Sequence, residues 1–134
     1  MLKEKKISFD NELTDQLNKL NKEYSSQTIH QRVEKLYNDF DQKDIMLTSS
    51  FAATSAMLLK VFSDVNPNQL IYFIDTGFHF KETLIYKDYL TKLYDLNVVD
   101  IIADKWKHDF TKNDKTWKKD PDFCCSVNKV EPLD

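Results

Sequence analysis

The sequence contains few of the residues that break, bend or cross-link a chain. Its 134 residues include one glycine, three prolines and two cysteines. No uninterrupted apolar run approaches the roughly 20 residues needed to cross a bilayer, so a membrane-spanning helix is not predicted. The basic residues Lys3, Lys5 and Lys6 are not followed by an apolar stretch, so a secretory leader is not predicted either. We therefore expect a cytoplasmic protein with no membrane partner.

The sequence also lacks a large excess of either charge. Lysine and arginine together number 19 and aspartate and glutamate 22, which gives a net charge of −3. A protein that binds nucleic acid through electrostatics normally carries a basic excess, so no nucleic-acid partner is expected. Apolar residues make up 41% of the chain, which is enough to form the core of one domain.

The first part of the chain reads as two amphipathic helices over residues 10–23 and 27–41. Asp10 and Ser26 stand where the caps of these helices are expected. Neither helix carries recognisable chemistry. We expect residues 1–44 to form an N-terminal helical segment that either packs on the core or makes a homo-oligomer contact.

From residue 45 onward, short apolar runs alternate with helical patterns. The predicted strands are 45–48, 70–74 and 98–102. Helices are predicted over 56–62 and 81–94. Strands without polar alternation, separated by helices, indicate an α/β fold with a parallel sheet covered by helices on both faces. Residues 45–134 are thus expected to form the core of a single domain. Beyond residue 103 the periodicity is weak, and no element is predicted.

A hydroxyl-rich loop follows the first predicted strand and precedes a helix. Its residues are Ser49, Ser50, Phe51, Ala52, Ala53, Thr54 and Ser55. In open α/β sheets, ligands bind beyond the carboxyl ends of strands. Hydroxyl groups, free backbone N–H groups and the helix dipole together favour an anion such as phosphate or sulfate. The alternative is a helix cap that happens to be rich in small polar residues.

The second predicted strand ends at Asp75, Thr76 and Gly77. The Asp75 carboxylate would either contact a ligand, such as a ribose or a lysine, or cap the helix that starts near Lys81. Gly77 is the one glycine of the chain, so we expect a positive φ angle and the close approach of a ligand at this position. The nearby His79 has no catalytic partner close by in the sequence, and the same holds for His30 and His108.

The adjacent residues Cys124 and Cys125 are the two cysteines. Neighbouring Cα atoms lie about 3.8 Å apart, below the roughly 4.4 Å that an ordinary disulfide needs, so no bridge between them is expected. Free thiols fit a reducing compartment. The pair consists either of inert core residues or of thiolate ligands, which nearby lysines would favour by lowering the thiol pKa.

Three segments together resemble the adenylyl-sulfate and phosphoadenylyl-sulfate reductases of the phosphate-loop pyrophosphatase superfamily. They are 48–56, 74–83 and 120–133, and they occur in the family's order. The chain departs from the family pattern at Ala52, where glycine is usual, and at Asn128, where arginine is common. Thr54 replaces the aspartate of the ATP-cleaving relatives, which removes a carboxylate that could bind a metal ion.

The resemblance implies a protein that reduces adenylyl sulfate or phosphoadenylyl sulfate to sulfite with thioredoxin or glutaredoxin thiols. It implies that 49–55 and 75–77 hold the nucleotide, and that Cys124 and Cys125 are two of the four thiolates of a four-iron (4Fe–4S) cluster, with Lys129 nearby. The family's nucleophilic cysteine lies later in the sequence, and no residue of this chain matches it. The chain is therefore expected to be an N-terminal portion that binds nucleotide without turning it over.

Residues 105–119 contain six lysines and two tryptophans. They form either a solvated surface or, with one or two lysines neutralising the substrate and an aromatic ring stacking on adenine, part of the site. Two other functions stay open. One is an ATP pyrophosphatase-type sulfur transferase or ligase, which would need a carboxylate for magnesium near the loop. The other is a non-catalytic module that binds adenine nucleotides.

Overall fold

The computed structural model describes residues 2–134, with side chains from residue 11 onward. The chain divides into two compact units, the first ending at Asp41 and the second running from Gln42 to Asp134. Within the described residues, no helix combines the length and the apolar character of a membrane span.

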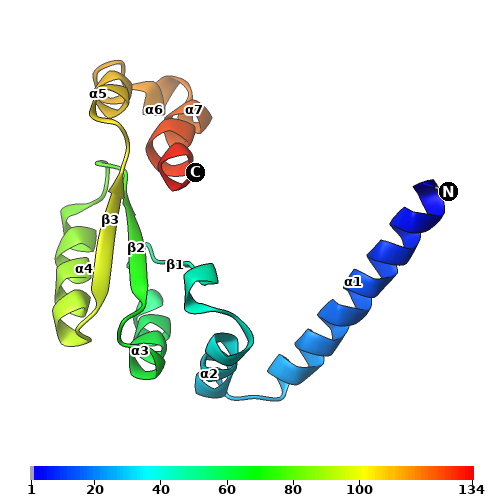
Figure 1. Cartoon of the computed structure of the whole chain (residues 1–134). Coiled ribbons are helices and arrows are strands. Elements are labelled where there is room, and N and C mark those ends of the chain that lie inside the picture. The colour runs from blue at the N-terminus through cyan, green and yellow to red at the C-terminus, as the bar shows by residue number, and fades with distance from the viewer. Residues whose placement is uncertain (1) are drawn as a thin grey trace. The chain divides into compact units, whose positions relative to one another are not determined.

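The first unit consists of helices α1 (Leu2–Ser25) and α2 (Ile29–Asp39) (Figure 1). The two predicted helices are confirmed, but both predicted caps are wrong. Asp10 lies within α1 rather than at its start. The N-cap of α2 is Thr28, because its hydroxyl accepts from the Gln31 N–H while the Gln31 side chain accepts from the Thr28 N–H. This reciprocal capping box satisfies two N–H groups that the first turn would otherwise leave free.

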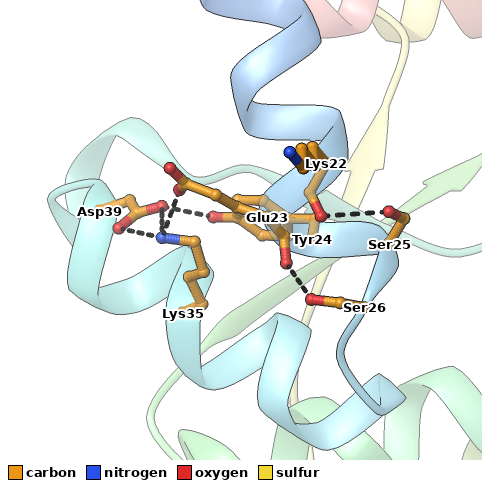
Figure 2. Close-up of polar contacts among 7 residues, drawn as sticks. All are labelled: Lys22, Glu23, Tyr24, Ser25, Ser26, Lys35 and Asp39. Atoms are coloured by element: carbon orange, nitrogen blue, oxygen red, sulfur yellow. Dashed lines mark hydrogen bonds and ion pairs between the residues drawn. The ribbon is translucent and has the colours of Figure 1, made fainter.

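A polar cluster joins the end of α1 to the end of α2 (Figure 2). The Tyr24 hydroxyl donates to Asp39 at 2.9 Å, and Lys35 Nζ lies 2.9 Å from Asp39 and 3.2 Å from Glu23. Hydrogen bonds from Lys35 and then Tyr24 hold the pKa of the Asp39 carboxyl below its ordinary value. Burial, followed by the bond to Asp39, raises the pKa of Tyr24. The ends of α1 and α2 are thus linked by one hydrogen bond, from Tyr24 to Asp39, and one ion pair, between Glu23 and Lys35.

The second unit is built on a parallel sheet of β1 (Leu47–Thr48), β2 (Leu70–Asp75) and β3 (Asn97–Ile102) in that order. Helices α3 (Ser55–Val65) and α4 (Lys81–Leu93) connect the strands (Figure 1). The predicted α/β class with a parallel sheet is confirmed. The first strand is two residues shorter than predicted, because only Leu47 and Thr48 pair with β2, whereas residues 45 and 46 lie between the strand and the 3₁₀ turn at residues 42–44.

The core lies between the sheet and the connecting helices. Phe51, Leu59, Phe73 and Leu90 are each exposed by 2% or less. Along β2, the fully buried Ile71 and Phe73 alternate with half-buried residues, so one face of the strand is sealed more completely than the other. Burying side chains of this size stabilises the fold by roughly 1.5–3 kcal/mol each.

Residues beyond 103 fold into short helical pieces, where the sequence predicted no element. They are α5 (Lys105–Asn113), α6 (Thr116–Lys119), α7 (Pro121–Cys125), the π-helical turn η2 (Ser126–Val130) and the 3₁₀ turn η3 (Glu131–Leu133). Each piece has nine residues or fewer, too few for a clear periodic pattern. The start of α7 is well defined, because Asp120 accepts from the Phe123 N–H at 3.0 Å and Pro121 occupies the first turn. Figure 1 shows α5, α6 and α7 at the end of the sheet toward which β2 and β3 run.

Candidate functional site

The two predicted ligand-binding loops leave neighbouring strands at the same edge of the sheet. β1 ends at Thr48 and β2 ends at Asp75, and these strands pair in parallel. The Ser49 N–H donates to the Tyr72 carbonyl at 3.1 Å, which extends the pairing to the start of the first loop. Loops at the carboxyl ends of adjacent parallel strands are where α/β sheets place their ligands.

Phe51 anchors the loop of residues 49–55. Its backbone has φ of +52°, a conformation that bulky residues rarely adopt, and its ring is 1% exposed. The strain costs about 1–3 kcal/mol. An edge-to-face contact with Phe73 and a hydrogen bond from the Phe51 N–H to the Ser49 hydroxyl offset this cost. The loop is therefore pinned in the core at its centre.

The rest of this loop is open to solvent. Ser50, Ala52, Ala53 and Thr54 are exposed, and Ser49 and Ser55 are half-buried. Thr54 stands at the N-cap position of α3, yet its side chain makes no capping hydrogen bond. The alternative reading of the hydroxyl groups as a helix cap thus finds no support at this residue. The first N–H groups of an α-helix have no intrahelical partner, and in α3 the first of them, the Ser55 N–H, donates to the Ala52 carbonyl at 2.8 Å.

The turn after β2 is held by its own side chains. Asp75 Oδ1 accepts from the Gly77 N–H at 2.9 Å, and the Thr76 hydroxyl accepts from the Phe78 N–H at 3.3 Å. The alternative in which Asp75 caps the next helix is wrong, because α4 begins after Phe80 and has no side-chain cap. Asp75 shapes the turn and leaves its second carboxylate oxygen for other contacts.

Gly77 sits where only glycine fits. Its φ is +71°, which confirms the predicted positive angle. A Cβ atom at this position would lie 2.5 Å from Cε1 and 2.8 Å from Nε2 of His108 on α5. The ring of His108 also stacks at a tilt against Phe78, with centroids 5.3 Å apart. The turn after β2 and helix α5 are therefore in direct contact.

A cavity of about 520 Å³ joins the turn after β2 to the cysteine pair. Its lining residues are Thr76, Phe78, Phe80, Trp117, Pro121, Cys124, Cys125, Asn128 and Lys129. The structure thus brings Thr76, both cysteines and Lys129 together, whereas residues 49–55 do not line this cavity. Cys124 is buried, Cys125 is exposed, and both thiols are free, so the prediction that they form no disulfide is confirmed.

The lysines of residues 105–119 differ in their surroundings. Lys105 pairs with Asp109 at 2.5 Å, Lys119 pairs with Asp114 at 2.7 Å, and Lys107 pairs with Glu131. These three amines already have carboxylate partners, which favours the solvated-surface interpretation for them. Lys129 is exposed and contributes to the wall of the cavity beside the thiols.

The two cysteines do not by themselves make up a metal site. Within the described residues, no group of three or more histidine, cysteine, aspartate or glutamate side chains is placed to hold a metal ion. Two thiols that open on one cavity fit half of the four-thiolate set that a four-iron cluster requires. The other half would have to come from outside these residues.

Sequence reasoning missed one hydrogen-bonded connection in this region. His108, Thr111 and Asn128 form a buried hydrogen-bonded cluster between α5 and η2. Each is an ordinary polar residue in a segment without clear periodicity, so nothing in the sequence marked them as partners. The π-helical turn that carries Asn128 also has no recognisable sequence signal.

The fold is that of an α/β domain whose candidate site lies at the carboxyl ends of parallel strands. Residues 44–134 match the model of the phosphoadenosine phosphosulfate reductase domain, and the chain belongs to this family.

Curated relatives carry the names of two kinds of reductase. The chain is 36% identical over 106 aligned residues to an adenosine 5'-phosphosulfate reductase of Chelativorans sp., covering 75% of this chain and 42% of the relative. It is 29% identical to that of Staphylococcus epidermidis, covering 96% and 54%. A phosphoadenosine 5'-phosphosulfate reductase of Gloeobacter violaceus is 34% identical, covering 66% and 38%. The chain thus spans about half the length of these relatives or less.

Proposed function

We propose that this chain is the nucleotide-binding portion of a sulfonucleotide reductase, which converts adenylyl sulfate or phosphoadenylyl sulfate to sulfite. The observation that carries the proposal is the cavity shared by Thr76, Cys124, Cys125 and Lys129. It connects a turn at the ligand-binding edge of the sheet with two thiols. Family membership and the names of the relatives support the same activity.

The binding roles follow from the chemistry of the two loops. Residues 49–55 offer hydroxyl groups and the N-terminal end of α3, which suit the oxyanion of a sulfated or phosphorylated group. Asp75, Thr76 and Gly77 would contact the nucleotide, with the free Asp75 oxygen able to accept from a ribose hydroxyl. Lys129 adds a positive charge at the cavity.

A four-iron cluster is the cofactor that the cysteine pair would help to hold. Cys124 and Cys125 would provide two thiolates, and the cluster would supply a polarising charge near the substrate. Lys129, on the same cavity wall, would offset negative charge there.

The reaction needs groups that this chain does not contain. In the proposed activity, a dithiol such as thioredoxin or glutaredoxin is oxidised to its disulfide, the substrate's sulfate is reduced to sulfite, and the adenine nucleotide leaves. The first attack comes from a cysteine thiolate, and both cysteines here are assigned to the cluster. The chain alone is therefore proposed to bind without turnover.

The proposal also includes a cytoplasmic location and a role for the N-terminal helices. Free adjacent thiols fit the reducing cytoplasm. Residues 1–44 would act as a helical segment attached to the 45–134 core or as a homo-oligomer contact. Of the two other functions, the ATP-cleaving one is disfavoured because residues 49–55 contain no carboxylate for magnesium.

Isothermal calorimetry tests the proposal. We expect heat with adenylyl sulfate, phosphoadenylyl sulfate or AMP, and no magnesium-dependent binding of ATP. Ser50→Ala should weaken binding about tenfold, the effect of losing one hydrogen bond to a charged group. Ser63→Ala is the matched control, because Ser63 lies on α3 and bonds only to the Lys60 carbonyl. Absence of heat with both sulfated nucleotides from a folded protein would overturn the proposal.

A further inference from the structure

The cluster of His108, Thr111 and Asn128 connects the turn after β2 to the buried cysteine. Asn128 Oδ1 lies 2.9 Å from His108 Nδ1. Asn128 Nδ2 donates to Thr111 Oγ1 at 2.9 Å and to the Cys124 carbonyl at 3.0 Å, and it lies 3.7 Å from Cys124 Sγ. Asn128 is 2% exposed and Thr111 is fully buried, so the bonds from Asn128 to Thr111 and to the Cys124 carbonyl are shielded from water, whereas the bond to the half-buried His108 lies nearer the surface.

Counting donors and acceptors fixes the tautomer of His108. The Thr111 hydroxyl gives its hydrogen to the His108 carbonyl, so toward Asn128 it acts as an acceptor. Both hydrogens of the Asn128 amide are then used, on Thr111 and on the Cys124 carbonyl. Asn128 Oδ1 must accept, and His108 must carry a hydrogen on Nδ1.

The other side of the His108 ring lies against Gly77. The space that a Cβ at residue 77 would need is occupied by Cε1 and Nε2 of this ring. Movement of the turn would therefore displace the His108 ring. Movement of His108 would in turn distort its hydrogen bond to Asn128, whose amide also donates to the Cys124 carbonyl. The chain of contacts runs from Gly77 through His108 and Asn128 to Cys124.

We propose that His108 and Asn128 are positioning residues that fix the Cys124 thiol relative to the Asp75–Gly77 turn. The inference rests on the proposed function only where it treats this turn as part of the nucleotide site. Neither residue is required to touch the substrate. Loss of either link frees the α7 backbone at Cys124 and exposes its sulfur.

Alkylation of single thiols by iodoacetamide tests this without nucleotide. In a Cys125→Ser background, only Cys124 reacts. His108→Phe keeps an aromatic ring against Phe78 but removes the N–H that donates to Asn128. It should raise the rate of Cys124 alkylation roughly five- to tenfold, which corresponds to the loss of one hydrogen bond. Asn128→Asp should do the same. His108→Asn places an N–H near the Nδ1 position and should restore the slow rate.

Two controls separate positioning from general loosening. His79→Phe alters a histidine that bonds to the Ile74 carbonyl and has no contact with Asn128, so the Cys124 rate should not change. In a Cys124→Ser background, the exposed Cys125 should react at one rate in all variants. Equal Cys124 rates in the wild type, His108→Phe and Asn128→Asp would overturn the proposal.

A measurement on the unaltered protein covers variants that fail to fold. Nitrogen-15 NMR of the imidazole should find His108 with its hydrogen on Nδ1. A neutral His108 with its hydrogen on Nε2 would overturn the assignment. Calorimetry with nucleotides reports on the proposed function, whereas the tautomer and the Cys124 rate do not involve nucleotide, so the two proposals fail separately.

Discussion

The ring of Phe51 meets the ring of Phe73 edge to face, with centroids 5.7 Å apart and an angle of 72° between the planes. One residue belongs to the loop after β1 and the other is the most buried residue of β2. A flexible-looking loop is thereby joined to the centre of the core. The buried Phe51 fixes the position of the loop, and the exposed Ser50 and Thr54 on either side of it remain able to contact a ligand.

Replacing Phe51 with alanine should be among the most destabilising single changes in the second unit. The substitution removes a fully buried ring and leaves a cavity beside Phe73, which typically costs about 3–5 kcal/mol. Urea unfolding followed by circular dichroism measures the loss. Phe80→Ala is the control, because Phe80 is 80% exposed and its loss should cost less than about 0.5 kcal/mol. Equal effects would contradict the anchoring role.

Gly77→Ala should destabilise the turn after β2 for two separate reasons. A φ of +71° costs an L-residue about 1–2 kcal/mol, and the new methyl group would also overlap the His108 ring. Combining it with His108→Ala separates the two terms, since the overlap disappears and the backbone cost remains. Urea midpoints of the single and double variants are the measurement. Additive effects would show that the ring contact has no energetic weight.

Thr111→Val should cost about 1–3 kcal/mol although the two side chains have nearly the same shape. The buried Asn128 amide loses an acceptor and the His108 carbonyl loses a donor, and no water can replace them. Thr111→Ser keeps the hydroxyl and should retain more stability than Thr111→Val. Thermal unfolding of both variants gives the comparison, and the opposite order would rule out the hydrogen-bonded cluster as a source of stability.

The α1–α2 contact should weaken at both extremes of pH. The pKa of Asp39 is lowered in the folded state, so its contribution is present above its unfolded pKa and is lost as the pH falls below about 4. The pKa of Tyr24 is raised, so its contribution is present below its ordinary value of 10.0 and is lost as the pH rises beyond it.

Hydrogen exchange of α2 amides between about pH 3 and pH 6, corrected for intrinsic rates, measures the acid limb of this dependence, since this range spans the ordinary Asp pKa of about 4. Protection should fall toward the acid end. Asp39→Asn removes this titrating group and leaves the Lys35–Glu23 pair, so the protection of the variant should depend less on pH over the same range than that of the wild type. A wild-type protein with constant protection would contradict the assignment of this limb to Asp39.

The two longer strands of the sheet could be predicted from the sequence because they are short runs rich in apolar residues, five before Asp75 in β2 and four around Asp100 in β3. Leu70–Asp75 and Asn97–Ile102 fall within one residue of the predicted strands at each end. The positive φ of Gly77 followed from the scarcity of glycine. The cap of α2 was predicted at the wrong residue, because Ser26 and Thr28 are both good capping residues. The feature that distinguishes them is the glutamine three positions after Thr28, which completes a capping box.

The region beyond residue 103 was unpredictable for a physical reason. Its helices are stabilised by contacts with each other and with the ends of the strands, not by a long apolar stripe that a pattern search would detect. The positions of the loop residues and of Cys124 and Cys125 could be inferred from the sequence only as separate motifs. Cys124 and Cys125 line one cavity with Thr76, whereas residues 49–55 do not. This arrangement depends on how α5 and α7 pack at the end of the sheet, which the separate motifs do not reveal.

The π-helical turn at Ser126–Val130 ties the spacing of this segment to its chemistry. One residue fewer before Asn128 would rotate everything after it by about 100° and bring Lys129 to the interior position. An ammonium group would then replace an amide among Thr111, His108 and Cys124, with no carboxylate to neutralise it. An insertion or deletion between Cys125 and Asn128 is therefore expected to disrupt this segment more than an exchange of one of its exposed side chains.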